Sequence, residues 1–295
     1  MDIIPILFGQ AWKSKMKNIV LTGATSGIGR EVARELLKKG HTVITNFRNM
    51  EKSEKVRDEL AKLTGNQNFV LLKADFEDFS SVNEFASEIT SRFESIEVLI
   101  NNAGTWETAF KETKNGFETN LQVNHLSPML LTLKLIPLLK KSGSSRIINT
   151  SSGAHRRDIL NLPDLEFRHS VYNGIATYSQ SKLLNILFSL ELAGRLHDTR
   201  ITVNTVHPGY VKTSLFDKMG DRNWSGVPDA ALGAQSAVYA ALSQEMEGIS
   251  GRYIYLDKED PNISELAKNE EIARKAWEKS TQLIGKYLEV EDIKI

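Results

Sequence analysis

Short runs of apolar and β-branched residues alternate along this chain with longer stretches in which apolar residues recur every three or four positions. The short runs, which are typical of strands, lie at 18–23, 41–47, 69–75, 97–104, 146–151, 201–208 and 252–257. The longer stretches, which are typical of helices, lie at about 27–39, 50–63, 80–93, 121–140, 178–197 and 230–243. The pattern therefore predicts seven strands joined by helices.

The predicted strands are continuously apolar instead of alternating, as in the runs at 19–21 and 98–100. Such strands are buried on both faces, and alternating strands and helices give a parallel sheet with helices over both faces. We therefore expect the α/β class with a doubly wound, seven-stranded parallel sheet. No Pro/Gly/Ser-rich linker, repeat or low-complexity tract divides residues 1–295, so we expect a single domain.

Two connections are too long and too polar to be simple turns. They cover 153–177 and 212–229, and long irregular loops in compact domains are usually functional. We expect them to form the walls of a substrate pocket. A last amphipathic helix, at about 263–285, is expected to pack on the rim of the sheet.

The composition excludes several classes of protein. Hydrophobic residues make up 41% of the chain and charged residues 25%, which is typical of a globular protein with a sizeable core. Lys and Arg number 37, as do Asp and Glu, so no net positive field attracts nucleic acid. The chain has no cysteine, which excludes disulfides, thiolate metal sites and a cysteine nucleophile.

The N-terminal stretch at 1–12 is apolar, but it contains Pro5 and is shorter than the roughly 20 apolar residues that span a bilayer. It also lacks the basic start and the small-residue cleavage site of a secretory signal. We expect no integral membrane segment and a cytoplasmic protein, while contact of this stretch with a membrane surface stays open.

The first predicted strand ends in a glycine-rich turn, TGATSGIG at 22–29. Gly23, Gly27 and Gly29 would let the backbone turn tightly and approach a pyrophosphate, whose charge is met by N–H groups at the start of the next helix. A turn of this kind also occurs without a ligand, so the motif alone is weak. Three further motifs follow in order: NNAG at 101–104, a serine pair at 151–152, and Tyr-x-x-x-Lys at 178–182.

Tyr178 and Lys182 stand four residues apart on a predicted helix and therefore on one face of it. An ammonium beside a phenol stabilises the phenolate and lowers the phenol's pKa from about 10, so such a tyrosine can exchange a proton near neutral pH. An isolated pair with this spacing is usually an ordinary helix face with a snorkelling lysine. The accompanying motifs favour the catalytic interpretation.

In these motifs the chain resembles the classical short-chain dehydrogenases/reductases over nearly its whole length. VNHL at 123–126, SSGAH at 151–155, Tyr172-Asn173 in the long connection and EEIARKAWEKS at 270–280 resemble the retinol-dehydrogenase-like branch. The WW-domain-containing oxidoreductases and the light-dependent protochlorophyllide reductases are relatives of that branch. The resemblance implies a Rossmann-type fold.

The resemblance also implies roles for four catalytic residues. Tyr178 would be the general acid/base, and Lys182 would be its electrostatic partner and a ligand of the nicotinamide ribose. Ser152 would hydrogen-bond the reacting oxygen; the segment from Ser152 to Tyr178 is longer than the common family spacing, which keeps Ser151 as the alternative. Asn124 would hold a water that links Lys182 to solvent. The alternative is that Asn124 is an ordinary polar helix residue that faces solvent.

The cofactor is expected to be NADP(H) in preference to NAD(H). NAD enzymes place a carboxylate after the second strand to meet the ribose 2′-hydroxyl, whereas NADP enzymes place an arginine there. Positions 46–48 carry no carboxylate, and Arg48 and Lys52 offer two cations to a 2′-phosphate. Lys52 could equally be a solvated residue at a helix start, and Asp75 could either accept from the adenine amino group or cap a helix.

The remaining cofactor contacts are implied by the resemblance alone. They are expected at Gly23, Thr25, Ser26, Gly27, Ile28 and Gly29, at Asn102, Ala103 and Gly104, and around the nicotinamide amide at Pro208, Gly209, Val211 and Thr213. His155, His169 and His207 have no metal-ligand spacing and no acidic cluster beside them, so we expect no metal.

These motifs predict an oxidoreductase that transfers hydride reversibly between NADP(H) and the carbonyl or alcohol carbon of a small or lipophilic substrate, which the sequence does not identify. The alternative function is not enzymatic: a protein of the same fold could sense NADPH or serve as a scaffold without turnover. The presence of Asn124, Ser152, Tyr178 and Lys182 together argues against this alternative, because a sensor has no need of a proton relay. The resemblance also implies that the apolar helices at 121–140 and 178–197 would form the surface of a homodimer, while the oligomeric state stays open.

Overall fold

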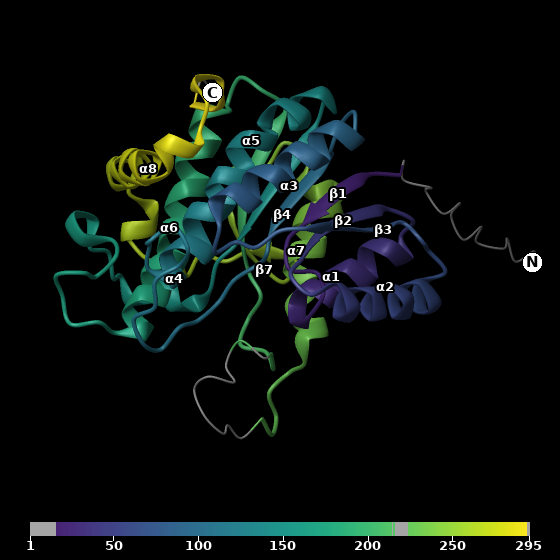
Figure 1. Ribbon diagram of the computed structural model, residues 1–295, viewed down its shortest axis with the longest axis horizontal. Coiled ribbons are helices and arrows are strands. Elements are labelled where there is room, and N and C mark those ends of the chain that lie inside the picture. Colours follow the sequence, from purple (N-terminus) through teal and green to yellow (C-terminus); the bar gives the residue numbers. More distant parts are fainter. Residues whose placement is uncertain (1–15, 214, 216–223, 294–295) are drawn as a thin grey trace, which may run out of the picture.

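A computed structural model describes residues 16–213, 215 and 224–293. The apolar stretch at 1–12 lies outside the described residues, as do positions 214 and 216–223 of the connection at 212–229. The described chain forms one twisted sheet between two layers of helices (Figure 1). Among the described helices, none is long and apolar enough to cross a membrane.

The sheet has eight strands in the order β3-β2-β1-β4-β5-β6-β7-β8. Their bounds are β1 Asn18–Leu21, β2 Thr42–Phe47, β3 Phe69–Lys73, β4 Val98–Asn101, β5 Ser145–Thr150, β6 Ile201–His207, β7 Tyr253–Tyr255 and β8 Lys258–Glu259. The seven strands β1 to β7 pair in parallel, and β8 pairs antiparallel with β7. The predicted α/β class and doubly wound parallel sheet are confirmed.

The predicted count of seven strands was wrong by one edge strand. After β7 the chain reverses at Leu256, which adopts a left-handed φ of +58° and donates its N–H to Ser236 Oγ at 2.7 Å. The returning strand β8 is two exposed charged residues long. A strand of this kind carries no apolar pattern, and its charges protect the sheet edge from pairing with another chain.

The helices are α1 Gly27–Lys38, α2 Met50–Thr64, α3 Phe79–Arg92, α4 Thr119–Leu121, α5 Ser127–Lys141, α6 Gly174–Arg195, α7 Ala230–Leu242, α8 Glu270–Ile284 and α9 Val290–Ile293. One apolar cluster joins α3, α5, α6 and α8 to one face of the sheet, and a second joins α1, α2 and α7 to the other face. Continuous burial on both faces explains why the strands are apolar throughout.

Three predicted helices have different bounds in the structure. The helix expected at 121–140 is interrupted by a π turn, Gln122–Leu126, between α4 and α5. Helix α6 begins at Gly174, four residues before Tyr178, because the Asn173 side chain accepts the N–H groups of Ile175 and Ala176. The helix expected at 263–285 begins only at Glu270, where Asn269 caps it.

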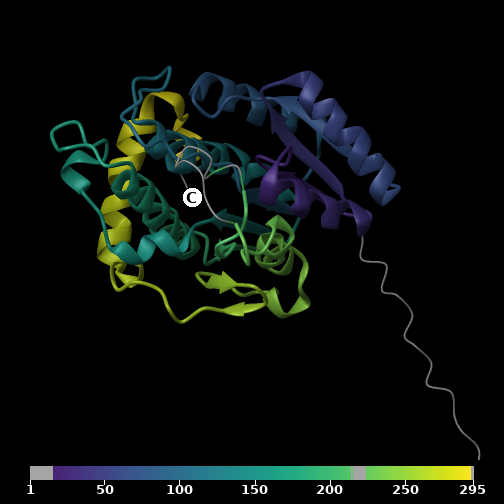
Figure 2. The ribbon, with the colours of Figure 1, turned by 90° about the horizontal axis from the view of Figure 1, so that it is seen from below.

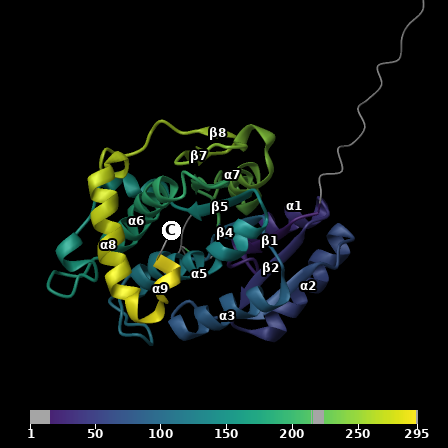
Figure 3. The same cartoon turned by 90° about the horizontal axis from the view of Figure 1, so that it is seen from above.

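The helix pair expected to form a homodimer is covered within the chain. Helix α8 lies along α6 (Figures 2 and 3). Trp277 of α8 stacks on Phe188 with ring centroids 5.7 Å apart and lies under the Arg195 guanidinium at 4.5 Å. Helix α9 covers α5, where Asp292 pairs with Lys134 at 2.6 Å. A homodimer stays a prediction, and it would need a surface other than this one.

Candidate active site

A cleft of about 400 Å³ opens at the carboxyl ends of the strands, next to the point where the strand order reverses between β1 and β4. Most of the site residues expected from the sequence line it. They are Gly23, Thr25, Ser26, Gly27, Ile28, Gly29, Arg48, Asp75, Asn102, Ala103, Gly104, Ser152, Tyr178, Lys182, Pro208, Gly209, Val211 and Thr213. Lys52 and Asn124 are not among the lining residues.

The glycine-rich turn requires its glycines for two different reasons. Gly23 and Gly27 adopt left-handed φ values of +73° and +52°. A Cβ on Gly29 would lie 2.2 Å from the Gly23 carbonyl oxygen and 2.6 Å from Asn102 Nδ2, so only glycine lets α1 approach the strand ends this closely. Asn46 fixes the turn by accepting the N–H of Gly23 at 2.8 Å.

Helix α1 differs in its start from the other long helices that begin at an extended residue; α5, which also lacks a side-chain cap, continues directly from the π turn. Its N-cap, Ser26, makes no side-chain capping bond, and its first turn has no acidic residue. By contrast, α2, α3, α6, α7 and α8 are capped by the side chains of Asn49, Asp78, Asn173, Asp229 and Asn269. The N–H groups at the start of α1 therefore face the cleft without a side-chain acceptor, which is the arrangement that binds phosphate groups.

The far end of the cleft carries Arg48 and Asp75. The Arg48 side chain is 68% exposed, and its Nη1 lies 3.8 Å from Glu77 Oε1. Asp75 Oδ1 accepts the N–H of Glu77 at 3.0 Å, and the cap of α3 is Asp78, so Asp75 is not the helix cap that was its alternative interpretation. Lys52 is exposed in the first turn of α2, which fits either interpretation, so its contact with a 2′-phosphate stays a prediction.

Tyr178 and Lys182 stand one turn apart on α6 at the opposite end, and both side chains are buried. Lys182 Nζ lies 5.6 Å from the centre of the Tyr178 ring and 3.4 Å from the main-chain oxygen of Thr150. Ser152 is hydrogen-bonded to the Tyr178 hydroxyl and is partly exposed to the cleft. Ser151 is buried, and its hydroxyl donates to the Lys182 carbonyl at 2.7 Å.

Burial sets the protonation of this pair. It raises the pKa of Tyr178 to about 12, against a smaller lowering by the hydrogen bond with Ser152. Burial also lowers the pKa of Lys182 to about 8. The lowered pKa that the Tyr178–Lys182 spacing predicts is therefore wrong for this structure: Lys182 is not among the causes of the shift, and burial removes the hydration that favours the charged form of each group.

Trp106 is a cleft residue that the sequence patterns missed. Its ring stacks on Tyr178 with centroids 4.5 Å apart and planes inclined by 10°. It lies in the segment that follows β4, two residues after the NNAG motif, and its neighbours in the sequence show no helix or strand pattern. An aromatic residue directly after a cofactor motif was the one signal that could have indicated this contact.

Asn124 lies behind Gly104, in the π turn. Both of its amide hydrogens are donated, to the Thr105 carbonyl at 2.9 Å and to Ser181 Oγ at 3.0 Å, and its Oδ1 accepts the N–H of Thr105 at 2.7 Å. A Cβ on Gly104 would lie 3.1 Å from Asn124 Oδ1 and 3.5 Å from Lys182 Nζ. Asn124 is thus buried beside Lys182 and does not face solvent.

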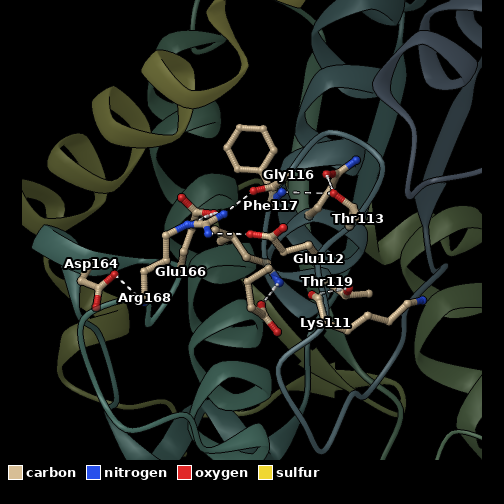
Figure 4. A network of polar contacts seen from close by, with 12 residues as sticks. Lys111, Glu112, Thr113, Gly116, Phe117, Thr119, Asp164, Glu166 and Arg168 are labelled. Carbon is tan, nitrogen blue, oxygen red and sulfur yellow. Dashed lines mark hydrogen bonds and ion pairs between the residues drawn. The ribbon is translucent and has the colours of Figure 1, made fainter.

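The connection at 153–177 is fastened to the segment 105–118, which carries Trp106. Arg168 Nη1 pairs with Glu112 Oε1 at 2.6 Å, and its Nη2 pairs with Glu166 Oε1 at 2.8 Å and donates to the Gly116 carbonyl (Figure 4). One guanidinium therefore joins two segments that are about fifty residues apart in the sequence.

A second, buried fastening joins the same two segments. The Tyr172 hydroxyl donates to Glu118 Oε1 at 2.8 Å and accepts from Asn120 Nδ2 at 3.2 Å. Glu118 is fully buried, and burial raises the pKa of its carboxyl group. The buried side chain of Leu165 and the ion pair of Arg156 with Asp260 at 2.6 Å also hold the connection at 153–177. None of its residues is among those that line the cleft, so its part in a substrate pocket stays a prediction.

The histidines near the cleft serve local contacts. His155 Nδ1 lies 2.7 Å from the Ser152 carbonyl oxygen, and the His207 ring stacks on Tyr255. Within the described residues, no group of three or more His, Asp or Glu side chains is placed to hold a metal ion.

Comparison with known proteins identifies the family of this chain. A family model described as short chain dehydrogenase matches residues 17–224. Human retinol dehydrogenase 11 is 38% identical over 275 residues, which cover 91% of this chain and 86% of that protein. Human retinol dehydrogenase 13 is 37% identical over 281 residues, which cover 91% and 85%.

Two solved structures resemble the fold. A crystal structure of a Mycobacterium paratuberculosis protein has a TM-score of 0.75 and 34% identity, over 91% of this chain and 93% of that one. A short chain dehydrogenase from Shigella flexneri complexed with NADP has a TM-score of 0.67 and 22% identity, over 82% and 97%. The second likeness concerns the fold alone. With the family match and the relatives above, the chain belongs to the short-chain dehydrogenase family, in its retinol-dehydrogenase-like branch.

Proposed function

We propose that this protein is an NADP(H)-dependent oxidoreductase that interconverts a carbonyl group and an alcohol. The observation that supports the proposal most strongly is a single cleft with Arg48 at one end, the start of α1 in the middle, and Tyr178 and Lys182 at the other end. A dinucleotide needs these three features in this order: a contact for the adenosine phosphate, N–H groups for the pyrophosphate, and a proton donor beside the nicotinamide.

The residues present fit such a cofactor. At positions 23 and 29 a side chain would collide with neighbouring atoms at the strand ends, and glycine keeps that space open. Helix α1 begins without a side-chain cap. Arg48 would meet the 2′-phosphate, Asp75 the adenine amino group, and Lys182 the nicotinamide ribose. NADP(H), when bound, supplies or accepts the hydride.

In the reductive direction Tyr178 would give its proton to the carbonyl oxygen as that oxygen gains charge. Its raised pKa keeps the phenol protonated at neutral pH, so the proton is present to be given. Ser152 would donate a hydrogen bond to the same oxygen and so stabilise the developing charge. Lys182 would stabilise the phenolate that remains, because an ammonium at this distance favours the ionised phenol.

Asn124 would complete the path by which Tyr178 regains a proton. Oδ1 of Asn124 and Nζ of Lys182 face the same space beside Gly104, where a side chain on that residue would otherwise lie. We propose that a water bridges these two groups and links Lys182 to solvent.

The substrate is proposed to be lipophilic. Trp106, Val211 and Leu215 are apolar lining residues of the cleft, and the relatives with about 37% identity are retinol dehydrogenases. A flat or extended apolar carbonyl compound would pack against the Trp106 ring where it lines the cleft.

The test is consumption of reduced cofactor with a panel of aldehydes, ketones and quinones that includes retinal. We expect NADPH to be consumed with at least one of them and NADH to be used much less well. Replacing Arg48 by Gln removes a charge-assisted contact of about 1.5 to 3 kcal/mol, so NADPH affinity should fall about ten- to a hundredfold and NADH affinity should barely change. Equal losses for both cofactors would contradict the proposed preference.

A further inference from the structure

A carboxylate stands beside the proposed phosphate-binding arginine, where it would be expected to weaken phosphate binding. Glu77 lines the same end of the cleft as Arg48, and its side chain is only 24% exposed. A carboxylate next to a dianionic phosphate repels it, and it also competes for the guanidinium. The contacts of Glu77 therefore decide what Arg48 can bind.

Glu77 is held mainly by another cation. Its Oε2 accepts from Lys111 Nζ at 2.9 Å, whereas its Oε1 lies 3.8 Å from Arg48, which is too long for a hydrogen bond. The hydrogen bond to Glu77 is the largest cause of a raised pKa of Lys111, and the charge of Arg48 acts in the opposite direction. Glu77 is thus paired with Lys111 more strongly than with Arg48.

The backbone holds Lys111 in place for this contact. The Lys111 carbonyl accepts both the N–H of Thr119 at 3.0 Å and its hydroxyl at 2.8 Å. The next residue, Glu112, bridges Glu118 as an isolated antiparallel pair and is held by Arg168. Figure 4 shows the Lys111 side chain extending away from Arg168 while Glu112 extends toward it. The ammonium of Lys111 is therefore directed away from the Arg168–Glu112 ion pair and toward Glu77.

We propose that Lys111 and Glu77 determine cofactor specificity, because Lys111 engages Glu77 and leaves Arg48 available to the 2′-phosphate of NADP(H). The side chains of Arg48, Lys111 and Glu77 together carry a net charge of +1. Without Lys111 the charge is zero, and Glu77 can turn to Arg48. The site then loses its net positive charge, and the Arg48 guanidinium is no longer free to donate to the cofactor. These are the two features that favour a 2′-phosphate over a 2′-hydroxyl. This inference rests on the proposed use of NADP(H) at Arg48.

The test is a double-mutant cycle with NADPH and NADH titrated separately by cofactor fluorescence at low salt. Lys111→Gln should raise the Kd for NADPH about three- to tenfold and change the Kd for NADH by less than about twofold. In the Glu77→Gln background, the same lysine substitution should change the Kd for NADPH by less than about twofold, because no carboxylate remains to be engaged.

Lys114→Gln is the matched control, since Lys114 lies on the same turn but pairs with Asp78 instead of Glu77. It should leave both cofactor affinities unchanged. If Lys111→Gln has no effect on NADPH, or lowers its affinity equally in both backgrounds, the inference is wrong. Arg48→Gln separates this failure from that of the proposed function: a selective loss of NADPH affinity there upholds Arg48, and an equal loss for both cofactors removes the premise.

Discussion

The two adjacent serines should respond differently to the same substitution, because their hydroxyls have different partners. Ser151 Oγ donates to the Lys182 carbonyl at 2.7 Å and is buried. Ser152 Oγ is partly exposed, accepts the N–H of Ala154 at 3.2 Å, and is hydrogen-bonded to Tyr178. Replacing each serine by alanine deletes one hydroxyl and leaves the backbone unchanged.

The magnitudes follow from those partners. Ser151→Ala removes the side-chain hydrogen bond to the Lys182 carbonyl, which keeps its partner within α6, and costs about 0.5–1.5 kcal/mol of unfolding free energy. Ser152→Ala removes a capping contact worth about 1 kcal/mol, but it also removes the proposed donor to the reacting oxygen. Loss of one such donor lowers the rate of the chemical step by about 10²–10³-fold.

The assay pairs urea unfolding with single-turnover reduction at saturating NADPH. We expect Ser152→Ala to lose most of the single-turnover rate with NADPH affinity intact, and Ser151→Ala to lose stability with a rate within about tenfold of the wild type. Ser151→Ala being the slower variant would refute this assignment and move the catalytic role to Ser151.

Three further predictions concern pH and the loop fastening. Lys182 has a pKa near 8, so the reduction rate should fall as pH rises through about 8, and Lys182→Arg should move that decline to higher pH in a rate–pH profile. His125 is fully buried, and burial lowers its pKa to about 4, so the unfolded state binds more protons between pH 6.5 and 4. Stability should therefore fall by about 2 kcal/mol from pH 7 to 5, and urea titrations should show a weaker fall for His125→Gln. Arg168→Ala should raise KM for the carbonyl substrate several-fold with an unchanged NADPH Kd, and an unchanged KM would mean that the loop does not need this contact.

The parallel sheet could be predicted because its strands are apolar on both faces, so each one appears in the sequence as an uninterrupted run. The cleft residues could be predicted for a related reason: parallel strands end at one edge, so motifs that follow β1, β4 and β5 meet there. The charged strand β8 carries no such pattern, and the count of seven failed at that strand.

Contacts between segments far apart in the sequence could not be predicted. The stacking of Trp106 on Tyr178 joins the segment after β4 to α6, and no periodic pattern around either residue indicates the other. The same holds for the raised pKa of Tyr178: the i,i+4 spacing predicts an effect of Lys182, but burial depends on what the whole fold places around the ring. The pattern of a single sequence shows which residues lie on one face of a helix or strand. It does not show how much water the packed structure removes from around a side chain.

The central claim is that Tyr178 is the proton donor in a cleft that binds NADP(H) independently of it, and Tyr178→Phe tests it most directly. The substitution keeps the ring that stacks on Trp106 and deletes only the hydroxyl. The measurement is NADPH affinity and turnover of the same preparation on a carbonyl substrate that the wild-type protein reduces. We predict an NADPH Kd within about twofold of the wild type and turnover lower by about a hundredfold or more, which is the usual scale of acid/base catalysis. Turnover at the wild-type rate would contradict the account.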